Sequence, residues 1–285
     1  MSIAVTGATG LLGEFVIDGL LQTQEPASIV AIIRDAGKAQ SLADRGVQVR
    51  VASYTDPTDL EIALQDVDKL LLISGSEVGQ RIDQHTNVVN ASRDAGVKHI
   101  FYTSAPHADT SKLVLVPEHK ATEAIIRESG IPFTFLRNNW YTENYVQNLE
   151  QAKRTGMVVA AAGKGRVASA SRADYAAGAV AALIADGQEG KVYEFSGDVA
   201  WDFNDLAAAI GEIIGKPVVY QAVTPDELVT TLTDAGLPEQ TAQFVAALDA
   251  GIAEGFLGEA TSDLSTLIGR PTTPLVDGLR AAAGA

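Results

Sequence analysis

The chain has 285 residues, of which 46% are hydrophobic, so it can bury a large core as one domain or two. It contains no cysteine, which excludes disulfides, thiolate metal sites and cysteine nucleophiles. Its formal net charge of −15 argues against a nucleic-acid partner, because phosphate binding needs a concentrated basic surface.

Targeting and metal signals are absent from the sequence. Residues 1–24 lack the basic and apolar regions of a secretory signal, and no stretch approaches 18 uninterrupted apolar residues. The four histidines show no short pairing typical of zinc ligands. We therefore expect a cytoplasmic protein with no membrane contact and no metal.

The N-terminal apolar run Ile3–Val5 leads directly into glycines at positions 7, 10 and 13, and an amphipathic stretch follows. The first glycine permits a tight turn, the second lets the backbone approach a pyrophosphate, and the third allows close helix–strand packing. The new helix directs its unpaired N–H groups and positive dipole end at the same place. This context predicts a nicotinamide dinucleotide site, with a plain strand-to-helix turn as the alternative.

The first half of the chain alternates short apolar runs with helical patterns. The expected strands are 3–5, 29–33, 47–51, 70–73, 100–103 and 133–136, and the expected helices are 11–22, 38–44, 57–65, 80–95 and 118–129. Such alternation predicts an α/β fold, a doubly wound parallel sheet of the Rossmann type. We assign residues 1–137 to this cofactor-binding domain, with strand contributions from later segments.

The pattern after residue 137 is less regular. A run at 158–161, a turn at 163–165, a helix at 173–185, a run at 192–195 and a helix at 204–214 precede a short strand at 218–220 and further helices. We expect residues 138–285 to form a smaller, mostly helical lobe over the carboxyl edge of the sheet. Ligands of open α/β sheets bind outside those strand ends, so the predicted site is the crevice between the lobes.

Arg34 ends the second strand pattern, where NAD-specific proteins tend to hold an acid and an arginine accommodates a 2′-phosphate. Arg34, with Lys38 nearby, favours NADP over NAD. Asp35 keeps NAD possible, and a solvated surface arginine is the structural alternative.

The apolar run at 70–73 ends in Ser74, Gly75 and Ser76, whose small side chains would let the chain pass close to the cofactor. A simple turn explains the same residues equally well. Arg81 and His85 follow at helical spacing and can lie near the phosphates, although we expect Arg81 on the surface.

The fifth strand pattern closes with Tyr102, Thr103 and Ser104. Short-chain dehydrogenases place a carbonyl-polarising serine here, with a Tyr-x-x-x-Lys pair on the next helix. None of the seven tyrosines has a lysine four residues later, and the next helix carries His119 and Lys120 instead. Ketone reduction needs a positioned acid, worth about 10²–10⁴ in rate, whereas a quinone or cationic dye does not. The site is therefore expected to reduce conjugated acceptors, or to perform no turnover, with electrostatic help from Lys120 or His119.

Amides and aromatic residues are densest just after the sixth strand pattern. Asn138 and Asn139 can hydrogen-bond a carboxamide or carbonyl, and Trp140, Tyr141 and Tyr145 offer flat faces for a ring. Aromatic residues at this spacing are also common in cores.

Arg172 precedes a later helix, where it can close over the cofactor or pair with an acid.

Several of these segments together resemble the NmrA-like atypical short-chain dehydrogenases, and within them the type 2 NAD(P)H:quinone oxidoreductases. They are Val5-Thr6-Gly7-Ala8-Thr9-Gly10-x-x-Gly13, Ala31-Ile32-Ile33-Arg34, Lys69 to Ser74, Ser76 to Arg81, Ala95 to Ile100, Leu136-Arg137-Asn138-x-Trp140-Tyr141-x-Glu143-Asn144-Tyr145, Ser169 to Ala177 and Leu267 to Thr273. The triphenylmethane dye reductases share most of the N-terminal half.

The resemblance implies flavin-free reduction of quinones with NADP(H), preferred over NAD(H), in the cytoplasm. Carried over by position, the cofactor residues are Gly7, Thr9, Gly10, Leu11, Leu12, Gly13, Arg34, Ser74, Gly75, Ser76, His85, Thr103, Asn138, Asn139, Trp140, Tyr141, Glu143 and Arg172. The expected catalytic residues are Asn138, Asn139, Tyr141 and Lys120, and the expected substrate contacts are Trp140, Tyr141, Asn144 and Tyr145. Lys120 is a departure, because the close family has an apolar residue there.

Two other functions fit the same pattern. A triarylmethane or azo dye reductase would use the same pocket, and a non-catalytic NADP(H)-sensing regulator would explain the missing Tyr-x-x-x-Lys pair. A homodimer is common in related folds, although no segment identifies an interface.

Overall fold

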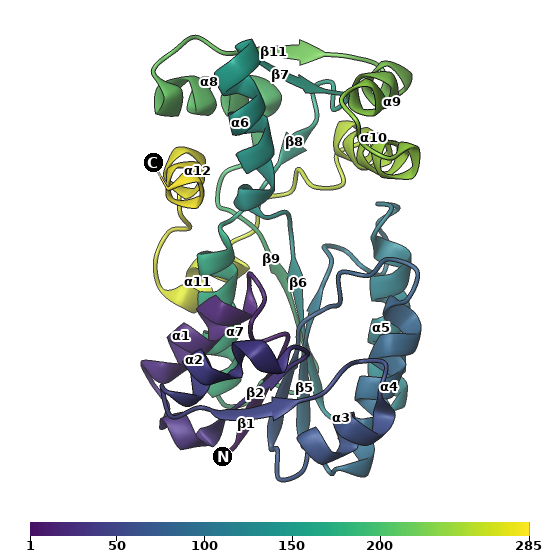
Figure 1. Cartoon of the computed structure of the whole chain (residues 1–285), viewed down its shortest axis with the longest axis vertical. Coiled ribbons are helices and arrows are strands. Elements are labelled where there is room, and N and C mark those ends of the chain that lie inside the picture. The colour runs from purple at the N-terminus through teal and green to yellow at the C-terminus, as the bar shows by residue number, and fades with distance from the viewer. Residues whose placement is uncertain (285) are drawn as a thin grey trace. The chain divides into compact units, whose positions relative to one another are not determined.

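A seven-stranded sheet forms the centre of the first unit in the computed structural model, which describes residues 1–284 (Figure 1). Its strands, in spatial order, are β3 (Gln48–Val51), β2 (Ile29–Ile33), β1 (Ile3–Thr6), β4 (Lys69–Leu72), β5 (His99–Ser104), β6 (Phe133–Asn138) and β9 (Lys191–Phe195). The pairings from β3 through β6 are all parallel. The carboxyl ends of these strands therefore meet at one edge, as the sequence predicted.

Helices cover both faces of this sheet. They are α1 (Gly13–Leu21), α2 (Ala39–Ala43), α3 (Pro57–Ala63), α4 (Arg81–Asp94), α5 (Val116–Glu128) and α7 (Arg172–Ile184), with short 3₁₀ turns η1 (Pro26–Ser28) and η2 (Ala36–Lys38). In Figure 1, α1 and α7 lie on one face, and α3, α4 and α5 lie on the other. The predicted doubly wound α/β fold is confirmed.

Burial on both sides explains the continuous apolar strands. All five residues of β2 are buried, because a central parallel strand has helices above and below it. In α1, Val16, Ile17 and Leu20 recur at helical spacing and are all buried. A methyl group on Gly19 would lie 3.0 Å from Val180 of α7, so a small residue there lets the two helices pack closely.

The first unit comprises residues 1–109, 117–138 and 172–194. The later segments α7 and β9 thus belong with the sheet, and β9 forms its edge next to β6. Residues 173–185 had been expected within the smaller lobe, whereas later segments had been expected to contribute strands to the sheet. The helix α7 joins this unit because it buries side chains such as Tyr175 and Leu183, whereas in the edge strand β9 only Phe195 is buried. The division at residue 137 stays a prediction.

The second unit contains residues 110–116, 139–171 and the chain from 195 onward. Its elements are η3 (Thr142–Tyr145), α6 (Val146–Thr155), β7 (Met157–Ala160), β8 (Arg166–Val167), β10 (Trp201–Asp202), α8 (Phe203–Ile214), β11 (Val219–Ala222), α9 (Pro225–Asp234), α10 (Glu239–Ala253), α11 (Asp263–Ile268) and α12 (Leu275–Ala283). β7 pairs with β11 in parallel, and β8 pairs with β10 antiparallel. Capping boxes at Asp202 and Thr224 begin α8 and α9.

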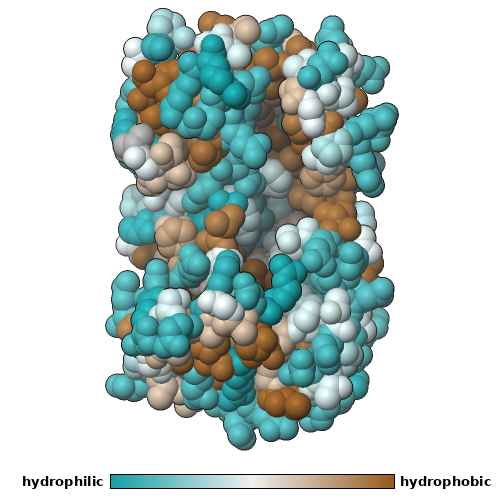
Figure 2. Space-filling model, viewed as in Figure 1, coloured by the Kyte–Doolittle hydropathy of each residue, from teal (hydrophilic) through white to brown (hydrophobic). Residues whose placement is uncertain are grey.

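Hydrophilic side chains are common on the face drawn in Figure 2, in keeping with the acidic composition. Figure 2 shows one face on which hydrophilic side chains predominate and apolar ones are scattered. No helix within residues 1–284 is long and apolar enough to cross a membrane. Those residues also contain no group of three or more His, Cys, Asp or Glu side chains that could hold a metal ion.

Candidate active site

The glycine turn between β1 and α1 has the geometry that its sequence predicts. Gly7 has a φ of +58°, and its carbonyl accepts a 2.8 Å hydrogen bond from the Gly10 amide. A Cβ on Gly13 would overlap the Gly7 carbonyl and lie 2.8 Å from the Cα of Ala8. Only a bare backbone fits here, so the turn leaves an open cradle at the start of α1. Gly7, Gly10 and Leu11 are exposed around it, Thr9 is half-buried, and Leu12 is buried.

Arg34 follows β2, and its side chain is largely exposed. Its Nη1 donates a 3.0 Å hydrogen bond to Oε1 of Glu77, an acid that lies 43 positions later. Asp35 instead accepts from the amide of Gly37 and caps η2. The acidic partner at this end of the sheet is therefore Glu77, not the adjacent Asp35.

The backbone after β4 is held by hydrogen bonds from below. The amides of Ile73, Ser74 and Gly75 donate to Thr6 Oγ1, Thr103 Oγ1 and His85 Nε2, at 2.9 to 3.0 Å. Since these amides are occupied, hydrogen bonds between a cofactor and this loop would involve the Ser74 hydroxyl or backbone carbonyl oxygens. Thr103 thus supports the loop, and its direct contact with the cofactor stays a prediction.

His85 is completely buried beneath this loop. Because its Nε2 accepts from the Gly75 amide, Nδ1 carries the proton and faces Thr122 Oγ1 at 2.9 Å. Burial, with a smaller contribution from the charge of Arg81, lowers the pKa of His85 to about 3. The ring is therefore neutral at physiological pH and is placed to position the loop.

Arg81 is buried, so the expectation that it lies on the surface was wrong. Its Nε donates to the Gly75 carbonyl at 2.9 Å, and its Nη1 pairs with Glu118 Oε2 of α5 at 2.8 Å. The other oxygen of Glu118 accepts from the Gly79 amide. The guanidinium donates hydrogen bonds to a carbonyl and to a carboxylate, and these bonds offset the desolvation cost of its burial.

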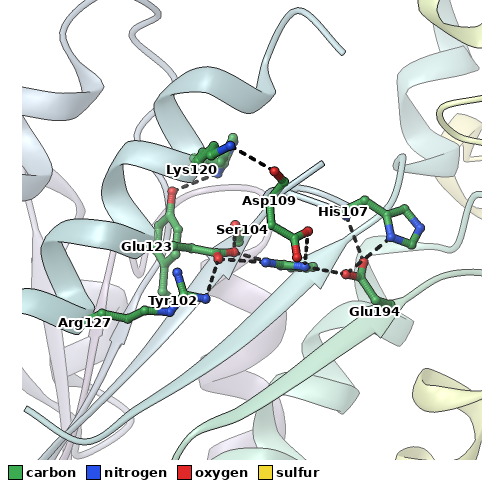
Figure 3. Close-up of polar contacts among 10 residues, drawn as sticks. Tyr102, Ser104, His107, Asp109, Lys120, Glu123, Arg127 and Glu194 are labelled. Carbon is green, nitrogen blue, oxygen red and sulfur yellow. Dashed lines mark hydrogen bonds and ion pairs between the residues drawn. The ribbon is translucent and has the colours of Figure 1, made fainter. Parts of the chain in front are cut away.

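The end of β5 differs from that of a short-chain dehydrogenase. Ser104, where such enzymes have a catalytic serine, donates a 2.7 Å hydrogen bond to Glu123. The Tyr102 hydroxyl lies 2.8 Å from His119 Nδ1, and exposed Lys120 donates to the carbonyl of Asp109 (Figure 3). Burial lowers the pKa of His119 to about 3, so its ring is also neutral. A catalytic role for Lys120 stays a prediction.

Arg137, at the end of β6, lies at the centre of a buried ion cluster. Its Nε and Nη2 each donate to one oxygen of Glu123 at 2.9 Å, and its Nη1 donates to Asp109 and Glu194. Figure 3 shows these three carboxylates converging from α5, from the chain after β5, and from β9. Burial lowers the Arg137 pKa, but hydrogen bonds to Glu123 and Glu194 outweigh it and raise that pKa above its usual value. The cluster ties together two strand ends and a helix.

Residues 139–144 lie in the second unit. The Asn139 side chain accepts from the Trp140 amide at 2.7 Å and donates to the Leu257 carbonyl at 3.3 Å. The backbone of Trp140 and Thr142 pairs with Ala170. Both ends of the Asn139 amide are thus engaged in shaping this segment, and its contact with a ligand stays a prediction.

The remaining predicted residues differ in exposure. Asn138 is buried, and Trp140, Tyr141, Glu143, Asn144 and Arg172 are half-buried. Ser76 is exposed.

Tyr145 is buried among other aromatic rings. Its ring packs edge-to-face on Trp201 at 4.8 Å and on Phe203 at 6.0 Å between centroids. Burial, and to a smaller extent the charge of Asp249, raises the pKa of its hydroxyl well above the usual value. This environment is that of a core side chain, and its predicted role in substrate binding is untested.

The comparisons place this geometry in a known group. Residues 1–261 match the NmrA-like family. The chain belongs to this family. Quinone oxidoreductase 2 of Escherichia coli strain K12 is 50% identical to this NmrA-like chain over 275 residues, which cover 96% of each protein.

Two solved relatives extend the likeness to structure. The NADPH complex of the Escherichia coli NADPH-dependent quinone oxidoreductase superposes with a TM-score of 0.95 at 49% identity, covering 98% of this chain and 99% of that one. The NADP(H) complex of Citrobacter sp. triphenylmethane reductase gives a TM-score of 0.94 at 44% identity, covering 99% and 100%. The sequence resemblance to the quinone oxidoreductases is confirmed.

Sequence reasoning missed the supporting residues of the site. Thr6, Glu77 and Gln84 had no assigned role, and Arg137 and Glu123 were not recognised as partners. Their partners lie 7 to 67 positions away in the chain, so no local spacing reveals them. One signal was available in the sequence: Arg137 directly follows the apolar end of a predicted buried strand, where a charged side chain needs a partner.

Proposed function

We propose that this chain reduces quinones to hydroquinones with NADPH by direct hydride transfer, without flavin or metal. The observation that carries the proposal is the 50% identity to quinone oxidoreductase 2 over 96% of both chains. The glycine cradle supports it independently, because the overlap that a Cβ at Gly13 would create is relieved only by a bare backbone.

NADPH, when bound, supplies the hydride, and a proton from water completes the hydroquinone. In the proposal, Gly7 to Gly13 hold the pyrophosphate and Arg34 meets the 2′-phosphate. Asn138 and the segment from Asn139 to Glu143 orient the nicotinamide and the quinone, with Trp140, Tyr141 and Asn144 against the ring. The protein chiefly contributes orientation and exclusion of water.

The polar groups around Ser104 explain why such an acceptor is favoured. Ser104 donates to Glu123 and the Tyr102 hydroxyl pairs with His119, so neither offers a free proton donor where a short-chain dehydrogenase has one. A ketone would need that acid, whereas a quinone forms a conjugated anion that water can protonate.

The test is loss of reduced-nicotinamide absorbance with flavin-free protein, NADPH and a panel of quinones. Protein-dependent oxidation is expected. Confirmed NADPH binding without turnover of any acceptor would contradict the proposal and favour a non-catalytic NADP(H)-sensing regulator.

Variants assign the residues. Arg34→Asp is expected to weaken NADPH binding, and unchanged affinity would remove Arg34 from the 2′-phosphate site. Asn138→Ala combined with Asn139→Ala is expected to impair turnover, and intact turnover would show that neither amide orients the reactants. Lys120→Met tests the electrostatic role of Lys120, with a matched Lys112→Met variant as control.

A triarylmethane or azo dye reductase is the second candidate, favoured by the TM-score of 0.94 to the Citrobacter enzyme. Comparing turnover of cationic triarylmethane dyes with that of quinones separates the two functions.

Cytoplasmic location and a homodimer complete the proposal. Light scattering of the purified protein measures the second.

A further inference from the structure

One carboxylate stands at the position where the proposed cofactor would bring its own negative charge. Glu77 Oε1 accepts from Arg34 Nη1 at 3.0 Å, and Glu77 Oε2 accepts from Gln84 Nε2 at 2.5 Å. Arg34 is the residue expected to receive a 2′-phosphate. Its guanidinium is therefore already partly neutralised by an acid of the same chain.

This acid is held in place more firmly than most surface carboxylates. Gln84 is buried on α4, and its Oε1 lies 3.1 Å from the place where a Cβ on Gly75 would stand. Gln84 is thus packed under the loop of residues 73–75 and presents a fixed donor. An exposed ion pair alone contributes little, but the second hydrogen bond from a fixed donor keeps the Glu77 carboxylate beside Arg34.

We propose that Glu77 sets the cofactor preference of this chain by weakening NADPH binding and supporting NADH binding. The inference rests on the proposed function for the identity of the cofactor. A 2′-phosphate carries a charge of about −2 and must share Arg34 with this carboxylate or displace it. A 2′-hydroxyl is a hydrogen-bond donor, which a carboxylate accepts and an arginine cannot.

Asp35 caps the 3₁₀ turn η2, whereas the acid that pairs with Arg34 is Glu77. Asp35 is the acid that adjoins Arg34 in sequence, but its Oδ1 is engaged by the Gly37 amide at 2.8 Å. The acid that NAD-binding proteins place near the second strand is in this chain supplied from the segment after β4.

The experiment measures dissociation constants of NADPH and NADH by titration calorimetry for the wild type and for Glu77→Gln, with folding checked by circular dichroism. The glutamine keeps the shape and removes the charge. We expect the NADPH dissociation constant to fall about threefold to tenfold and that of NADH to rise about twofold to fivefold. The gain for NADPH should shrink in 1 M salt, because exposed charges are screened within about 3 Å there.

Glu61→Gln is the matched control, since it makes the same change at an exposed position of α3. The inference is overturned if Glu77→Gln weakens NADPH binding, which would mean that Glu77 holds Arg34 ready for the phosphate. It is also overturned if both dinucleotides change by one factor, or if the control gives the same shift.

The two proposals fail separately. Binding of NADPH without quinone turnover, together with the expected shifts, would remove the proposed function and leave the role of Glu77. A wild-type chain that binds neither dinucleotide would overturn both.

Discussion

Replacing Arg137 with methionine should destabilise the first unit strongly, because it leaves three carboxylates without their shared cation. Asp109 is 63% exposed and can be hydrated at once, and Glu194 is 22% exposed. Glu123 is only 1% exposed but keeps its bonds to Ser104 and Arg127. Removing one partner of a buried ion pair costs about 3–5 kcal/mol of unfolding free energy. Because Glu123 keeps these other bonds, we expect Arg137→Met to lose about 3 kcal/mol.

Two further variants calibrate this value. Arg137→Lys keeps the charge but loses the two-pronged contact with Glu123, and should lose about 1–2 kcal/mol. Arg127→Met removes a 44% exposed partner of the same carboxylate, and should lose about 1 kcal/mol including its contact with the Phe135 ring.

Unfolding in urea, followed by far-ultraviolet circular dichroism and by hydrogen exchange of the β5 and β6 amides, measures these losses. Both tryptophans, Trp140 and Trp201, lie in the second unit, so their fluorescence reports that unit alone. The reasoning is refuted if Arg137→Met loses no more than Arg127→Met, or if exchange in β6 is unchanged.

Three further predictions concern buried titratable groups. The folded-state pKa of His85 and of His119 is about 3, below the usual 6.5, so only the unfolded chain takes up protons between these values. The free energy of unfolding should therefore fall as pH drops below about 6.5, by roughly 1.4 kcal/mol per pH unit for each histidine. Urea titrations at pH 7 and pH 5 measure how the free energy of unfolding changes with pH. If His85→Gln shows the same change as the wild type, the prediction is wrong. Burial raises the folded-state pKa of Asp249 to about 6. The buried carboxylate therefore lowers the free energy of unfolding progressively as pH rises from about 4 through 6. Asp249→Asn should therefore raise the free energy of unfolding by up to about 3 kcal/mol at pH 7.5 and leave it unchanged at pH 3.5, and a gain at both values would count against this cause. The buried Tyr145 hydroxyl has no hydrogen-bond partner among the described residues. Tyr145→Phe should therefore leave the free energy of unfolding unchanged or raise it, by at most about 1 kcal/mol. Thermal unfolding and quinone turnover of the variant test this prediction. Loss of turnover at unchanged stability would contradict it and indicate that the hydroxyl binds substrate.

The central strands of the sheet could be predicted because most of their residues are apolar. The expected strand at 29–33 coincides with β2, and the expected helix at 80–95 exceeds α4 by one residue at each end. A strand that is buried on both faces appears in the sequence as a continuous apolar run. The glycine turn could also be predicted, because its three glycines lie at fixed spacing within one short segment.

The supports of the site could not be predicted in the same way. Arg81 has the composition of a surface residue, and only the arrival of Glu118 from another helix makes its burial favourable. Asp35 was considered as the acid that keeps NAD binding possible, whereas the acid that pairs with Arg34 is Glu77, from the segment after β4. Pairings between distant segments depend on the order of strands, which local periodicity does not encode.

The sheet of the first unit is assembled from three separate stretches of chain, and its edge strand β9 is the last to be synthesised. A ribosome must therefore pass residue 195 before the sheet of the first unit can be completed. A fragment ending at residue 137 would expose β6 as an unpaired edge, with the Arg137 guanidinium deprived of Glu194. Such a fragment should aggregate. The N-terminal part with the glycine turn is thus not an independently folding domain. Exchanging it between relatives would require residues 172–194 to be exchanged as well.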